Sequence, residues 1–217
     1  MSQIPAARTK LRPPVLGGLL VLAILIVGAG LYGTGWLPGN SPDSGCAASA
    51  AALERLRPLA QGEVAAFEVS REPVRAPDFA IAGPDGTRRD LASFRGRAVL
   101  LNLWATWCEP CKREMPALDR LQAELGGPRF EVAAVNIDTR NVERPKAWLD
   151  QAGVKNLAFY ADHEAKIFQD LRRAGLADGM PTTILIDAAG CRLGRVAGPA
   201  EWASPDALAL VRAALRT

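Results

Sequence analysis

Short apolar runs and segments with a helical spacing of apolar residues alternate along the chain beyond residue 97. Runs rich in Val, Leu and Ile are typical of buried strands, and apolar residues that recur every three or four positions are typical of amphipathic helices. Strands that alternate with helices, followed by a hairpin and a last helix, predict an α/β fold with a mixed central sheet flanked by helices. The expected strands are residues 97–104, 130–137, 157–160, 182–187 and 192–196, and the expected helices are residues 108–125, 145–151, 165–174 and 204–216.

The segment before residue 97 has weaker patterns. Residues 47–60 are strong helix formers with Leu53, Leu56 and Leu59 on one side, and a helix this short needs a surface to dock on. Residues 64–69 and 74–82 are expected to be extended. The turn Gly-Pro-Asp-Gly at 83–86 predicts a hairpin over 78–90, followed by a helical turn at 91–94.

The N-terminal part predicts a membrane anchor. Residues 15–32 contain no charge, and their extension to Leu37 gives a stretch that spans a bilayer with Tyr32 and Trp36 at its far interface. Basic residues before the span place the N-terminus in the cytoplasm. A cleaved signal peptide is the alternative, but the cleavage-like residues 27–29 lie inside the apolar run. The expected organisation is a cytoplasmic N-terminus (1–14), a transmembrane signal-anchor helix (15–37), a flexible tether (38–45) and a domain on the far side of the membrane (46–217) with an N-terminal extension at 46–73.

Composition narrows the class of protein. The chain has 217 residues, of which 49% are hydrophobic, and its net charge of +3 equals the contribution of Arg8, Lys10 and Arg12. The rest of the chain is balanced in charge, so no basic stripe indicates nucleic-acid binding. Four cysteines are too few for a disulfide scaffold, and the fold therefore rests on its apolar core.

The motif Cys108-Glu109-Pro110-Cys111 stands where the predicted strand 97–104 gives way to a helix. Free backbone N–H groups and the positive end of the helix dipole favour a thiolate on Cys108, and Cys111 lies one turn later on the same face. This context indicates a thioredoxin-like redox motif. Half of a zinc site is the alternative, but beyond this motif the chain offers only two scattered cysteines and His163, so we expect no metal. We assign His163 no role.

Proline 181 stands in Gly-Met-Pro-Thr-Thr, residues 179–183, just before a predicted strand. An isolated proline here is usually an ordinary loop residue. In a thioredoxin-like site, however, a proline at this position has a cis peptide bond and packs against the two cysteines. We therefore predict a cis bond between Met180 and Pro181, and a substrate-binding loop of Met180, Pro181 and Thr182 on which an extended client pairs as an added strand.

Several neighbours of the cysteines are candidates for a supporting role, with Trp107 and Pro110 immediately beside them. Glu114 is either an ordinary surface carboxylate or, if it turns inward, a proton relay to Cys111. Glu109 places negative charge beside Cys108, which opposes an extremely acidic thiol. Asn102, on the incoming strand, is either a satisfied buried amide or a functional one.

Cys46 and Cys191 are the two remaining cysteines. Free thiols are a liability in an oxidising compartment, which favours a bond between them. Such a disulfide would staple the N-terminal extension to the last hairpin.

Residues 103–116, Leu-Trp-Ala-Thr-Trp-Cys-Glu-Pro-Cys-Lys-Arg-Glu-Met-Pro, resemble the membrane-anchored TlpA/ResA-type thioredoxins of bacteria. The resemblance runs from Cys46 to the end of the chain, and the anchor is similar in kind. Four more stretches carry it: PLAQGEV at 58–64, NIDTR at 136–140, FQDL at 168–171 and GPAEWAS at 198–204.

This resemblance implies a thioredoxin fold with an N-terminal extension and an inserted strand and helix before Ala165. It implies a periplasmic reductase that is anchored in the bacterial inner membrane and has no cofactor. In it, Cys108 is the nucleophile, Cys111 the resolving cysteine, and Cys46 with Cys191 a structural disulfide. The implied partners are a Sco-type copper chaperone and cytochrome oxidase subunit II as clients, and a membrane thiol carrier as electron donor. Glu109 departs from part of the family and is shared with cytochrome c-maturation relatives, so reduction of apocytochrome c is an alternative. A non-catalytic module that docks cysteine peptides is an alternative of another class.

Overall fold

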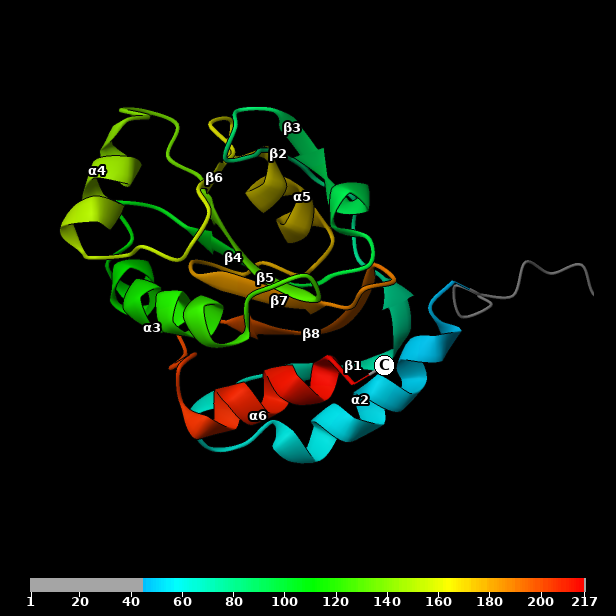
Figure 1. The fold of residues 1–217 in the computed structure, drawn as a ribbon. Coiled ribbons are helices and arrows are strands. Elements are labelled where there is room, and N and C mark those ends of the chain that lie inside the picture. The colour runs from blue at the N-terminus through cyan, green and yellow to red at the C-terminus, as the bar shows by residue number, and fades with distance from the viewer. Residues whose placement is uncertain (1–44, 217) are drawn as a thin grey trace, which may run out of the picture. The chain divides into compact units, whose positions relative to one another are not determined.

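The computed structural model describes residues 45–216, whose eight strands form one mixed sheet with helices on both faces (Figure 1). The strand order is β1-β8-β7-β4-β5-β6-β2-β3. The strands are β1 (Glu68–Arg75), β2 (Ala80–Ala82), β3 (Arg88–Asp90), β4 (Ala98–Trp104), β5 (Phe130–Asn136), β6 (Tyr160–Ala161), β7 (Thr182–Ile186) and β8 (Cys191–Ala197). The α-helices are α2 (Ala50–Leu56), α3 (Glu109–Leu125), α4 (Arg144–Gln151), α5 (Lys166–Arg173) and α6 (Pro205–Ala214), and the 3₁₀ turns are η1 (Ala47–Ser49), η2 (Arg57–Leu59), η3 (Gly62–Val64) and η4 (Leu91–Phe94).

The centre of the sheet is formed by β4 and β5, which are parallel and buried at every position. Their nearly continuous apolar sequences are what a strand covered on both faces requires. β6 continues the parallel part, and β7 pairs antiparallel with the other edge of β4. The predicted mixed α/β sheet is therefore confirmed.

Helices α3 and α6 cover one face of this sheet, and α5 lies on the other (Figure 1). On the first face, ion pairs join Arg212 of α6 to Glu124 of α3, and Arg120 of α3 to Glu201, which lies shortly before α6. The predicted cap of the last helix is present, because the Ser204 hydroxyl accepts the Ala207 N–H at 3.1 Å.

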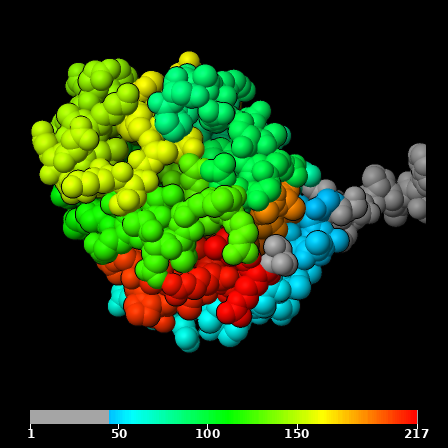
Figure 2. Space-filling model, viewed as in Figure 1, coloured from blue at the N-terminus to red at the C-terminus, as the bar shows by residue number. Residues whose placement is uncertain are grey.

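The N-terminal extension docks as its apolar side predicts. Helix α2 contacts β1 and α6, and its Leu53 and Leu56 are fully buried. In Figure 2 the cyan surface of this extension lies against the red surface of the C-terminal helix. The expected helix over 47–60 is divided into η1, α2 and η2, and α2 ends at Leu56 because Pro58 cannot continue the α-helical hydrogen bonds.

Three predicted extended segments have different limits in the structure. Segment 64–69 is divided between η3 and the start of β1, and segment 74–82 is divided between the end of β1, which pairs with β8, and β2. The predicted hairpin over 78–90 is confirmed, because β2 and β3 pair antiparallel on either side of the turn at 83–86. The strand expected at 157–160 is only β6, Tyr160–Ala161. Here the buried carboxylate of Asp119 accepts the backbone N–H groups of Lys155, Asn156 and Leu157, which holds that segment as a loop.

The predicted anchor over 15–37 and all but the last residue of the tether over 38–45 lie outside the described residues. Within residues 45–216, no helix combines the length and the apolar character needed to cross a membrane.

Candidate active site

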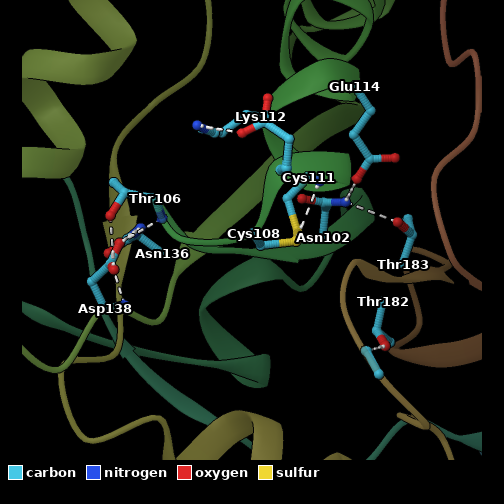
Figure 3. Close-up of a disulfide and its surroundings, with 12 residues drawn as sticks. Asn102, Thr106, Cys108, Cys111, Lys112, Glu114, Asn136, Asp138, Thr182 and Thr183 are labelled. Atoms are coloured by element: carbon cyan, nitrogen blue, oxygen red, sulfur yellow. Dashed lines mark hydrogen bonds and ion pairs between the residues drawn. A yellow bond between two sulfur atoms is a disulfide. The ribbon is translucent and has the colours of Figure 1, made fainter.

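The cysteines of the motif are joined by a disulfide with a Cα–Cα distance of 5.3 Å (Figure 3). Cys108 is the N-cap residue of α3, and its sulfur accepts the Cys111 N–H at 3.3 Å. Cys108 retains 5% exposure, whereas Cys111 has none. Of the two sulfurs, that of Cys108 is therefore the one that an incoming disulfide can reach.

The electrostatic surroundings of Cys108 favour a thiolate when the bond is reduced. The helix N-terminus and the Cys111 N–H both stabilise negative charge on this sulfur. Glu109 opposes them, but Lys112 lies 2.6 Å from its carboxylate, and the hydrogen bond from Lys112 lowers the pKa of Glu109. The ion pair offsets part of the repulsion that the sequence predicts.

Glu114 points inward, so the surface position considered from the sequence is wrong. Its side chain is 3% exposed; one carboxylate oxygen accepts the Asn102 side-chain amide at 2.7 Å and the other accepts the Ala200 N–H at 3.1 Å. Burial raises the pKa of Glu114 to about 7, against the lowering effect of these hydrogen bonds. Because Glu114 follows Cys111 by one turn of α3, a group that titrates near neutral pH stands behind the buried sulfur.

Asn102 connects three elements of the site (Figure 3). It is fully buried on β4, and its amide also donates to the Thr183 hydroxyl of β7 at 2.9 Å. Among residues 45–216 its own side-chain oxygen has no hydrogen-bond partner, so it is not the fully satisfied amide that the sequence allows. Asn102 therefore fixes Glu114 of α3 against the start of β7.

The loop before β7 lies next to this network. The peptide bond between Met180 and Pro181 is cis, as predicted. The Thr182 hydroxyl donates to the Gly179 carbonyl at 2.7 Å, and the Pro181 carbonyl accepts the Gly198 N–H at 2.9 Å. Within the described part of the chain, neither backbone group of Met180 has a hydrogen-bond partner. An extended peptide can pair with these groups.

A second polar network was not predicted from the sequence. The Asp138 carboxylate accepts the Thr106 N–H at 2.9 Å, the Thr106 hydroxyl at 3.0 Å and the Asn136 amide at 2.8 Å (Figure 3). It holds the segment just before Cys108. Asn136 is the last residue of β5 and Asp138 follows it, and the carboxyl end of β5 lies beside that of the parallel strand β4, so the spacing was a usable signal. His163, which received no role, has its Nδ1 3.3 Å from the Asp138 carbonyl oxygen.

Cys46 and Cys191 are joined by the second disulfide, with a Cα–Cα distance of 5.7 Å. Cys191 begins β8, whose other end, Ala197, pairs with Thr182 beside the Pro181 loop. Cys191 therefore lies at the end of β8 opposite the Pro181 loop, and both cysteines of the second disulfide are buried.

Residues 72–209, which contain the cysteine motif, the Met180–Pro181 loop and the sheet that joins them, match the sequence pattern of the family described as Redoxin. The chain belongs to the Redoxin family. Thioredoxin-like protein YneN of Bacillus subtilis is 46% identical over 66 residues, which are 30% of this chain and 38% of YneN. Thiol-disulfide oxidoreductase ResA of Geobacillus thermodenitrificans is 35% identical over 118 residues, 53% of this chain and 63% of that protein. The chain thus spans less than two thirds of both relatives.

A solved structure gives a fuller match. The putative thiol:disulfide interchange protein DsbE from Chlorobium tepidum is 31% identical, with a TM-score of 0.56, over 68% of this chain and 97% of that one. The thioredoxin-like fold that the sequence predicts agrees with this structural match and with the names of the relatives.

Proposed function

We propose that this protein is a thiol–disulfide oxidoreductase that reduces disulfides in client proteins. The observation that supports it most is the difference between the two cysteines: Cys108, at a helix N-terminus, retains a small exposure, and Cys111 has none. This is the arrangement that attack by one cysteine and resolution by the other requires. The names of the Redoxin relatives support the same reaction.

The reaction begins with the reduced protein. The Cys108 thiolate bonds to one sulfur of a client disulfide, that disulfide breaks, and the second client sulfur leaves as a thiolate. The Cys111 thiol then loses its proton and bonds to Cys108, and the bond between Cys108 and the client breaks. Two electrons pass to the client, and the protein is left with the Cys108–Cys111 disulfide seen in the structure.

In this mechanism Glu114 accepts the proton of Cys111. A base works best when its pKa is near the operating pH, and burial raises the pKa of Glu114 to about 7. Its hydrogen bonds to Asn102 and Ala200 hold the carboxylate in place while it titrates. Glu114 acts on Cys111 and not on Cys108, because it follows Cys111 by one turn.

The proposed clients and location rest on the sequence resemblance. A membrane-anchored, periplasmic reductase would serve a Sco-type copper chaperone and cytochrome oxidase subunit II, with electrons from a membrane thiol carrier. Apocytochrome c is the second candidate client, because the resemblance places glutamate at the positions of Glu109 and Glu114 in the cytochrome c-maturation relatives. In each case an extended client segment pairs with the free backbone of Met180.

Trapping in membranes tests the function and the client together. Full-length Cys111→Ser protein should accumulate disulfide-linked clients through Cys108, and mass spectrometry should identify a copper-assembly protein or apocytochrome c. The Cys108→Ser/Cys111→Ser variant is the matched control. If both variants bind the same proteins without a covalent link, the protein is a docking module and not a reductase.

A further inference from the structure

A pocket of about 260 Å³ lies beside the active-site disulfide, and Trp107, the residue before Cys108, forms part of its wall. Thr106 and Asp138 also line it. In Figure 3 these two residues stand on one side of the disulfide, and Thr182 stands on the other. The pocket is therefore separate from the Met180 backbone on which a client strand pairs, but it begins at Trp107, the chain neighbour of Cys108.

The pocket is positively charged. Arg140 and Arg144 line it, both are exposed, and neither forms an ion pair with any carboxylate in the part of the chain that the structure describes. The Asp138 carboxylate, also in the wall, is buried and already accepts three hydrogen bonds from Thr106 and Asn136. The lining thus carries two guanidinium groups without an ion-pair partner among the described residues and one carboxylate whose hydrogen bonds come from Thr106 and Asn136. The net charge of the lining is positive, so an anion complements the pocket.

The rim of the pocket is suited to a polypeptide. Among residues 45–216, the large hydrophobic side chains that remain exposed are Trp107, at 65%, and Val142, at 40%. Val142 stands between Asn141 and Arg144, which line the pocket. Tryptophan and arginine are the residues that contribute most at protein contacts, where apolar contact is combined with hydrogen bonds to a carboxylate.

We propose that Trp107, Arg140 and Arg144 form a client subsite, the arginine subsite, which binds an aspartate or glutamate side chain of the polypeptide whose disulfide Cys108 attacks. The proposal rests on the proposed reductase function and adds a preference for acidic residues near the client cysteine. The guanidinium groups donate two parallel hydrogen bonds to the carboxylate, which positions the client disulfide over Cys108.

The test measures exchange between the reduced full-length protein in detergent and disulfide-bonded peptides. Each peptide carries one Glu placed one to four residues from its cysteine, on either side, and is paired with a Gln version of the same sequence. For at least one position, the Glu peptide should react about five- to tenfold faster than the Gln peptide at low salt. The preference should shrink as ionic strength rises.

Variants assign this preference to the subsite. Arg140→Gln/Arg144→Gln should abolish it, and Arg140→Lys/Arg144→Lys should keep part of it, because lysine retains the charge but not the forked geometry. Arg129→Gln is the matched control, because Arg129 is also exposed but precedes β5, at the opposite end of the strand from the pocket. The Arg129→Gln protein should prefer the Glu peptide as strongly as the wild type does.

Two results overturn the proposal: equal rates for every Glu and Gln pair, or an equal loss of preference in the Arg129→Gln protein. A neutral small disulfide, 2-hydroxyethyl disulfide, separates this failure from failure of the proposed function. If the wild type reduces it while showing no Glu preference, only the subsite is wrong. If the wild type does not reduce it at all, the reductase function and the subsite are both wrong.

Discussion

Replacing Glu114 by glutamine should remove a pH dependence that the buried carboxyl gives to stability. The pKa of Glu114 rises from 4.5 to about 7 on folding. Well below pH 4.5 the carboxyl is protonated in the folded and unfolded states, so stability is not reduced. Between pH 4.5 and 7 the unfolded chain ionises the carboxyl while the folded protein keeps it protonated, so stability falls with rising pH until the folded protein ionises it as well. With 1.36 kcal/mol per pH unit, the wild type loses about 3 kcal/mol of unfolding free energy by pH 8.

The glutamine side chain does not ionise, so the free-energy difference between variant and wild type should shift by about 3 kcal/mol in favour of the variant from pH 4.5 to pH 8. Urea unfolding of the oxidised proteins, followed by tryptophan fluorescence, measures this difference. Glu109→Gln is the control on the same helix: the pKa of Glu109 is lowered, so its contribution is complete above its ordinary pKa and lost only in more acidic solution. A Glu114→Gln difference that stays constant over this range would falsify the assignment of a buried, titrating carboxyl.

Three further predictions concern the disulfides and the packing. The Cys46→Ser/Cys191→Ser protein should melt roughly 10 °C lower than the wild type, because the bond closes a long loop of the unfolded chain. Its rate of exchange with a small disulfide at room temperature should match that of the wild type, and a slower rate would contradict a purely structural bond. Gly194→Ala should lose about 1–3 kcal/mol of unfolding free energy, since a Cβ would stand 2.4 Å from the Phe67 ring; Gly127→Ala, where nothing lies within 4 Å, is the neutral control in the same denaturation assay. Equilibration with glutathione should give the active-site couple a reduction potential nearer about −270 mV than about −120 mV, and a value above about −180 mV would indicate an isomerase or oxidase.

Local signals account for the features that the sequence predicted well. The change from an apolar run to a helix start places Cys108 at a cap, and no distant residue is needed to infer it. The strands β4 and β5 are apolar at nearly every position, and a strand of this kind is buried only when both of its faces are covered, as at the centre of a sheet. The limits of β1 and β6 were missed because they depend on pairing with β8 and on the Asp119 side chain, and neither is encoded in the segments themselves.

The position of Glu114 shows what a local pattern leaves open. A glutamate on an amphipathic helix is usually exposed, but this one accepts hydrogen bonds from Asn102 of β4 and from the backbone of Ala200, 86 residues away. The arginine subsite also depends on segments that are distant in the sequence. Trp107 lies just before α3 and Arg144 begins α4, and only the fold brings both into the wall of one pocket. Both depend on contacts between distant segments.

The most direct test of the central claim is the product of one round of exchange, measured by mass spectrometry after acid quenching. Reduced wild-type protein and one disulfide-bonded peptide should give two free thiols on the peptide and a Cys108–Cys111 disulfide, with Cys46 and Cys191 still linked. The Cys111→Ser protein should stop at a mixed disulfide on Cys108, and the Cys108→Ser protein should give no product, because Cys111 is buried. A mixed disulfide on Cys111 in the Cys108→Ser protein, formed as fast as the one on Cys108, would contradict the assignment of the two roles.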